Sequence, residues 1–162
     1  MTIRDEVNHI LKQKKLSESD FFSLPMHYYK KVEKQIEGHF VEEHQSLHWA
    51  NMGHYEKELI YFAFQSQQPE EWVKKLPRFL YQPHDYYYFA LEDRNGYRPK
   101  YWHYEGVLRA LITVLSELPY LDYSIITKKM DLMISENHHV VVTFVGNNFK
   151  YAKTAAFFNG FK

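Results

Sequence analysis

The apolar positions of the chain change their spacing near residue 57, so two structural parts are expected. Before that point they recur three or four residues apart, as on one face of a helix: Ile3, Val7, Ile10 and Leu11, then Met26, Tyr29, Val32 and Ile36. Thr2 followed by Asp5 favours a helix start, and Gly38 favours a helix end. With a third helix over residues 39–52, we predict a helical N-terminal part, residues 1–53.

After residue 57, short apolar runs alternate with turn signals, which is typical of strands. The predicted strands are 59–64, 85–91, 97–104, 121–127, 130–135 and 140–145, and the predicted helices are 69–76, 107–118 and 149–158. Asn95-Gly96 predicts a hairpin turn. Because hairpins outnumber crossovers, we expect an α+β fold: a mostly antiparallel sheet of about five to six strands with helices on one face. Residues 1–162 are expected to form a single domain, with the sheet-containing core at 54–162.

The composition excludes several classes of protein. The chain has no cysteine, which excludes disulfide frameworks, thiol catalysis and cysteine-based metal centres. Lys plus Arg and Asp plus Glu both number 20, whereas a dedicated nucleic-acid binder normally has a basic excess. There is no apolar leader segment and no apolar run of about 18 residues. We therefore expect a cytoplasmic protein that binds neither nucleic acid nor membranes.

Aromatic residues form 18% of the chain, and seven of its 14 tyrosines lie between Tyr81 and Tyr104. Tyrosine favours half-buried strands, which is one interpretation of this density. It is also enriched at protein interfaces, because a large apolar ring carries a polar tip. Under the second interpretation, Tyr87 and Trp102 are anchors for a protein partner.

The charge is concentrated in one segment although the chain is neutral overall. Residues 33–71 hold eight glutamates and two lysines, a net charge of −6. This segment is either an ordinary charged surface or a region that steers a cationic partner. In the second case Glu42, Glu43, Glu56 and Glu58 are the expected partner-binding acids.

Two groups of histidines are candidates for chemistry. His44 and His48 are four residues apart, the spacing of two metal ligands on a helix, but a third ligand at defined spacing is missing. We expect neither a metal nor a cofactor. Asn137, His138 and His139 follow Glu136 between two predicted strands, and they form either a structural corner or a site of acid–base chemistry. No catalytic residue is assigned.

Residues 86–146 carry two distinctive elements, Trp102-His-Tyr-Glu-Gly106 and Glu136-Asn-His-His139. On these elements the chain resembles a family of small, uncharacterised bacterial domains. In type it is also similar to the immunity (antitoxin) proteins that are paired with LXG-type polymorphic nuclease toxins. This resemblance implies a binding protein, in preference to an enzyme, that neutralises a cognate toxin by protein–protein contact. The alternative is a small-ligand-binding protein or a metal-independent enzyme that uses the Asn-His-His corner.

Overall fold

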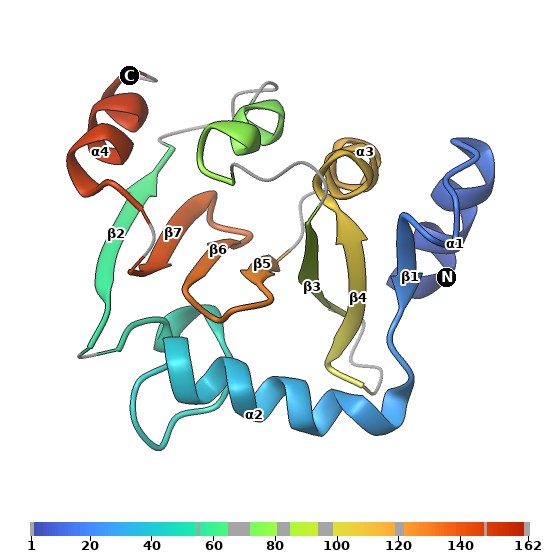
Figure 1. Ribbon diagram of the computed structural model, residues 1–162, viewed down its shortest axis with the longest axis horizontal. Helices are drawn as coiled ribbons and strands as arrows, with labels where there is room; N and C mark the ends of the chain where they lie inside the picture. The colour runs from blue at the N-terminus through green and yellow to red at the C-terminus, as the bar shows by residue number, and fades with distance from the viewer. Residues whose placement is uncertain are drawn as a thin grey trace.

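A seven-stranded antiparallel sheet with helices on both faces forms the protein (Figure 1). The computed structural model describes residues 2–54, 56–64, 72–80, 85–93, 99–118, 122–147 and 149–160. The α-helices are α1 (Ile3–Gln13), α2 (Tyr29–Phe40), α3 (Leu108–Glu117) and α4 (Tyr151–Asn159), and the 3-10 helices are η1 (Met26–Tyr28), η2 (Trp49–Asn51) and η3 (Val73–Arg78). The strands are β1 (Phe21–Ser23), β2 (Glu58–Ala63), β3 (Tyr86–Glu92), β4 (Tyr101–Val107), β5 (Tyr123–Thr127), β6 (Leu132–Glu136) and β7 (Val141–Gly146).

The strand order is β1-β4-β3-β5-β6-β7-β2, so both edge strands come from the first 63 residues of the chain. β3 pairs with both β4 and β5, α3 connects β4 to β5, and β5, β6 and β7 form a meander. Each pair is antiparallel, for example Phe89 opposite Ile125 and Ile125 opposite Ile134. β2 pairs with β7 along its whole length, with Tyr61 opposite Thr143. β2 is therefore an edge strand of the described sheet.

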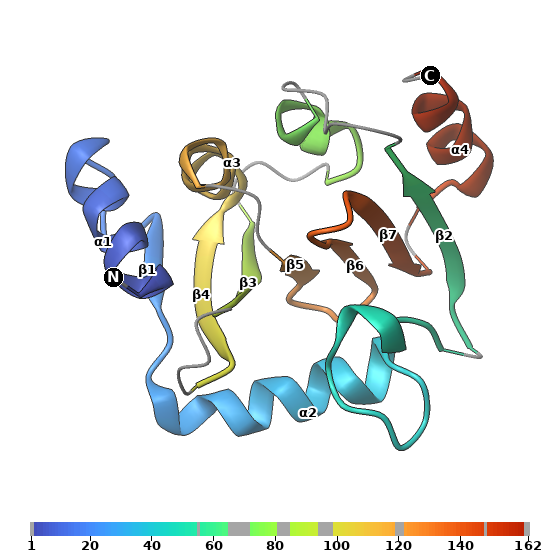
Figure 2. The same cartoon turned by 180° about the vertical axis from the view of Figure 1, so that it is seen from behind.

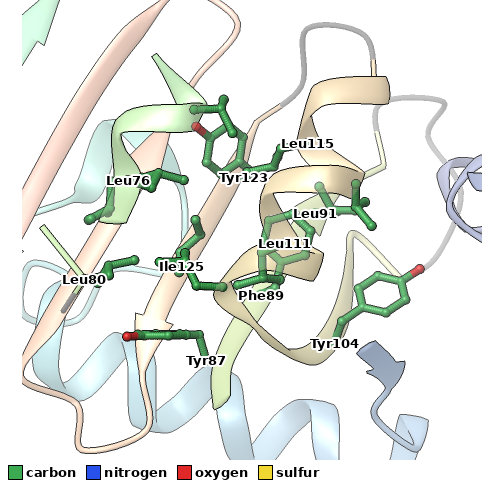
Figure 3. Close-up of a cluster of buried hydrophobic side chains, with 14 of the residues drawn as sticks. Leu76, Leu80, Tyr87, Phe89, Leu91, Tyr104, Leu111, Leu115, Tyr123 and Ile125 are labelled. Atoms are coloured by element: carbon green, nitrogen blue, oxygen red, sulfur yellow. The ribbon is translucent and has the colours of Figure 1, made fainter. Parts of the chain in front are cut away.

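The core lies on both faces of the sheet. On one face α1, η3, α3 and α4 pack over a row of strand residues that includes Phe89, Ile125, Ile134 and Phe144; Figure 3 shows Leu111 of α3 beside Phe89. On the other face α2 covers Ala90, Ile126, Met133 and Val145 through Val32, Ile36 and Phe40. Figures 1 and 2 both show α2 along the opposite side of the strands from α3 and α4.

The α+β class and the antiparallel sheet are confirmed, and the expectation of helices on one face only is wrong. The inner strands are apolar at successive positions, so both of their faces require cover. The sheet also has one strand more than expected, β1, which pairs with the end of β4 and interrupts the helical N-terminal part.

Two helix predictions in the N-terminal part are also corrected. α2 continues through Gly38 to Phe40, because its apolar stripe, which ends in Ile36 and Phe40, outweighs the cost of one exposed glycine. The rest of the helix expected over residues 39–52 is a loop, residues 41–52, that is closed by a bridge between Val41 and Met52 and contains only the short η2. The Asn95-Gly96 turn lies outside the described residues. Within the described ranges, no helix combines the length and the apolar character that crossing a membrane requires.

Candidate functional site

The edge strand β2 exposes large apolar side chains on one face. Leu59 is 42% exposed and Tyr61 is 70% exposed. Because side chains alternate along a strand, Ile60 and Phe62 point to the opposite face, where the Phe62 ring stacks on Phe158 of α4 at 5.1 Å. Strand β2 therefore has one face in the core and one face available to solvent.

The four acids expected to bind a partner are all exposed, and they lie on this edge strand or on the segment between α2 and the strand. Glu56 and Glu58 are at its start, and Glu42 and Glu43 are on the loop of residues 41–54 that leads to it (Figure 1). We call Glu42, Glu43, Glu56, Glu58, Leu59 and Tyr61 the acidic edge surface. The loop borders a pocket of about 610 Å³ that Glu37, Glu42, Glu43 and Lys34 help to line.

The loop that carries Glu42 and Glu43 is fixed at several points. The backbone N–H of Leu47 donates to Oε1 of Glu37 at 3.0 Å, and the hydroxyl of Tyr101 donates to the Leu47 carbonyl at 2.9 Å. The N–H of Glu42 also donates to the carbonyl of Asn51. The backbone of the loop is thus held in place before any partner arrives, which lowers the entropic cost of binding.

Tyr87 and Trp102, expected as exposed anchors, lie in the core instead. They are 4% and 8% exposed. The indole N–H of Trp102 donates to Oδ2 of Asp93 at 2.9 Å, and the Arg4 guanidinium lies 5.2 Å from the Trp102 ring centroid. Among the described residues of β2, Tyr61 is an exposed aromatic, and sequence reasoning missed it. An apolar run such as 59–64 does not reveal which strand will be at an edge.

Asn137, His138 and His139 form the turn between β6 and β7. The side-chain oxygen of Asn137 accepts hydrogen bonds from the backbone N–H groups of His139 and Val141, at 2.9 and 3.1 Å. Asp122 accepts from the backbone N–H of His138, and its carboxylate lies 3.1 Å from Nδ1 of the same residue. His138 is about one-third exposed at the side chain, and Asp122 is buried.

Glu136, the last residue of β6, is buried, and its carboxylate makes hydrogen bonds away from this turn. Its Oε2 accepts hydrogen bonds from the hydroxyl of Tyr123, at 2.7 Å, and from the indole N–H of Trp72, at 3.2 Å. Burial raises the pKa of Glu136 to about 7, and the two hydrogen bonds oppose that shift. The carboxyl thus joins β5 and β6 to the segment at the start of η3.

His44 and His48 do not form the pair on one helix face that their spacing suggested, because residues 41–48 are not helical. Nδ1 of His48 accepts from the N–H of Ala50 at 3.1 Å, and Nε2 of His44 lies 3.4 Å from Glu43. In the part of the chain that the structure describes, no three His, Asp or Glu side chains are grouped as metal ligands would be.

The fold and this surface define an α+β protein with an exposed acidic sheet edge. Residues 1–155 match a family of unknown function, DUF6756, so the chain belongs to that family. The match includes the N-terminal helices and β1 as well as the segment on which the resemblance rested. No curated protein and no solved structure matches the chain.

Proposed function

We propose that this protein is an immunity-type binding protein that neutralises a cationic toxin of the nuclease class by covering its surface. The observation that carries the proposal is the acidic edge surface, in which β2 exposes Leu59 and Tyr61 and four exposed glutamates lie on β2 and on the segment that leads to it. Apolar and aromatic side chains supply most binding energy, while charges at the rim raise the association rate. A nuclease has to present cations to bind the phosphate backbone of its substrate, so an acidic surface complements it.

The backbone of β2 supports the same proposal. β2 is hydrogen-bonded to β7 on one side and is the last strand in the order of the described sheet. An extended segment of a partner can add to such an edge through backbone hydrogen bonds. In this arrangement Tyr61 contacts partner side chains above the added strand, and Glu56 and Glu58 contact its cationic flank.

The Asp122–His138 pair is a second candidate, favoured by one observation. A buried carboxylate holds the imidazole of a partly exposed histidine, which is the arrangement of a general base and its orienting acid. It would serve a small-ligand site or a metal-independent enzyme. The same contacts also close the β6–β7 turn, and that role accounts for them without any chemistry.

Co-expression with the product of the adjacent gene tests the proposed function. We expect the two chains to co-purify and the cells to survive expression of the adjacent product only when this chain is present. Glu43→Lys should weaken protection, whereas Glu18→Lys, an equal charge change on an exposed residue between α1 and β1, should not. Absence of both complex and protection would contradict the proposal. If the isolated protein hydrolyses a small substrate and His138→Ala abolishes that activity, the second candidate is favoured.

A further inference from the structure

A second pocket lies between η3 and the first turns of α4, on the face of β2 opposite Leu59 and Tyr61. Its volume is about 350 Å³, within the range of small-molecule sites. Phe79 at the end of η3 and Phe157 on α4 line it, and their rings meet edge to face at 5.1 Å. We call this space the cationic pocket, because basic side chains line it.

Every charged residue that lines the cationic pocket, among those that the structure describes, is basic: Arg78, Lys150 and Lys153. None of the three forms an ion pair with a carboxylate in the described ranges of the chain, and all three are exposed. Three cations from two elements that converge on one cavity repel one another. Bound negative charge relieves this repulsion.

The wall of the pocket is aromatic. Phe79 is 8% exposed and packs parallel to Phe158, while Phe149 and Phe157 are half-buried. The guanidinium of Arg78 lies 5.3 Å from the centroid of the Phe157 ring, which places positive charge directly against an apolar surface. A ligand in this pocket therefore meets a flat apolar surface and a cationic rim together.

Thr154 adds a polar group to the pocket. This residue lines the cavity and is only 2% exposed. Its backbone N–H donates to the Lys150 carbonyl at 2.9 Å, and its hydroxyl is not among the buried side-chain atoms of the described residues that lack a hydrogen-bond partner. A threonine hydroxyl has one O–H to donate, so an oxygen of a ligand in the pocket can accept from it.

We propose that the cationic pocket binds a small aromatic phosphate. A phosphate monoester carries close to two negative charges at pH 7 and has several acceptor oxygens, which match three cations and one hydroxyl. Arg78 offers the planar fork that pairs with phosphate oxygens, and the phenylalanine wall accepts the ring. The inference is independent of the proposed function, since it uses none of the acidic edge surface.

Titration of the ¹⁵N-labelled protein with phenyl phosphate, followed by NMR, tests this inference. We expect saturable binding with a Kd below about 1 mM, with shifts concentrated at residues 73–80 and 149–160. Inorganic phosphate lacks the ring and benzyl alcohol lacks the charge, so each should bind at least about tenfold more weakly. Absence of saturable binding, or equal binding of inorganic phosphate, would overturn the proposal.

Variants locate the site within the same experiment. Lys150→Ala/Lys153→Ala should weaken phenyl phosphate binding at least about tenfold, whereas Lys31→Ala, on exposed α2, should leave it unchanged. Thr154→Val keeps the shape of the side chain and removes only the hydroxyl, so the fold is retained and binding weakens. Binding that is unchanged in the double variant would show that the phosphate sits elsewhere and would also overturn the proposal.

Discussion

The hydroxyl of Tyr123 donates a hydrogen bond to Oε2 of Glu136 at 2.7 Å, inside the protein. The two residues lie directly opposite each other on β5 and β6. Burial also raises the pKa of the Tyr123 hydroxyl well above its ordinary value. It therefore remains a hydrogen-bond donor throughout the range in which Glu136 titrates.

Glu136→Gln should remove one pH dependence of stability. The Glu136 pKa is about 7 in the folded protein and near 4.5 when unfolded, so between these pH values the folded state binds more protons. The free energy of unfolding of the unmodified protein therefore falls as pH rises from 4.5 to 7, by about 3 kcal/mol from this group. The amide of the variant has no proton to lose, so its stability relative to the unmodified protein should increase over that range. Urea denaturation at several pH values measures the difference, and parallel curves would contradict the assignment.

Asn137→Ala should destabilise the fold by about 2 kcal/mol, because two backbone N–H groups of the β6–β7 turn lose their acceptor. His139→Ala is the control: it removes an exposed side chain from the same turn and keeps the backbone N–H. We expect it to stay within about 0.5 kcal/mol of the unmodified protein. Thermal and urea melts of both variants make the measurement. If the two variants are equally stable, the Asn137 side chain does not stabilise the β6–β7 turn.

Two glycine substitutions should act in opposite directions. A Cβ at Gly146 would lie 2.8 Å from the Leu132 Cα and would clash with the Asp131 carbonyl, so Gly146→Ala should cost at least about 2 kcal/mol. A Cβ at Gly38 would meet nothing within 4 Å, and Gly38 lies inside α2. Gly38→Ala should therefore stabilise the protein by about 0.5–1 kcal/mol. Chemical denaturation of both variants measures the two effects; a stabilised Gly146→Ala variant would contradict the strand register.

Substitution of a core tyrosine and of a surface tyrosine should affect the stability of the protein to different extents. Tyr87 is 4% exposed in the core, so Tyr87→Ala should cost about 3–5 kcal/mol. Tyr61 is 70% exposed, so Tyr61→Ala should change the stability by less than about 0.5 kcal/mol. Calorimetry of the two variants measures this. A destabilised Tyr61→Ala would show that this ring is needed for the fold and would remove it from the acidic edge surface.

Local pattern was sufficient to predict six of the seven strands, because each is a run with clear turn signals at its ends. β1 was missed because three residues carry no readable period, and its pairing with β4 joins positions more than 80 residues apart. The helix expected over 39–52 fails because the loop is held by distant contacts, such as Tyr101 to Leu47. The apolar run from Leu132 to Ile134 is the sequence signal for cover on both faces of the sheet, since an alternating strand would have a polar residue within it.

The exposure of the four acids of the candidate surface follows from their charge alone, and their role in binding a partner stays a prediction. The aromatic anchors could not be predicted, because density of tyrosine does not distinguish a core strand from a surface strand. Tyr87 lies on β3 near the middle of the sheet, whereas Tyr61 lies at its edge, and only the strand order separates them. The contact of Glu136 with Trp72 is equally invisible, since the two residues are 64 positions apart in sequence.

The most direct test of the binding proposal is the association rate with the purified partner as a function of salt. The Debye length falls from about 30 Å at 0.01 M to about 8 Å at 0.15 M, so steering by the four glutamates should fade over this range. Glu42→Lys/Glu43→Lys should lower the association rate and reduce its salt dependence, with a smaller effect on dissociation. Tyr61→Ala should instead speed dissociation, while Tyr151→Ala, a half-exposed tyrosine on α4, should change neither rate. Rates that are independent of salt and unaffected by both the charge reversal and Tyr61→Ala would contradict the proposal.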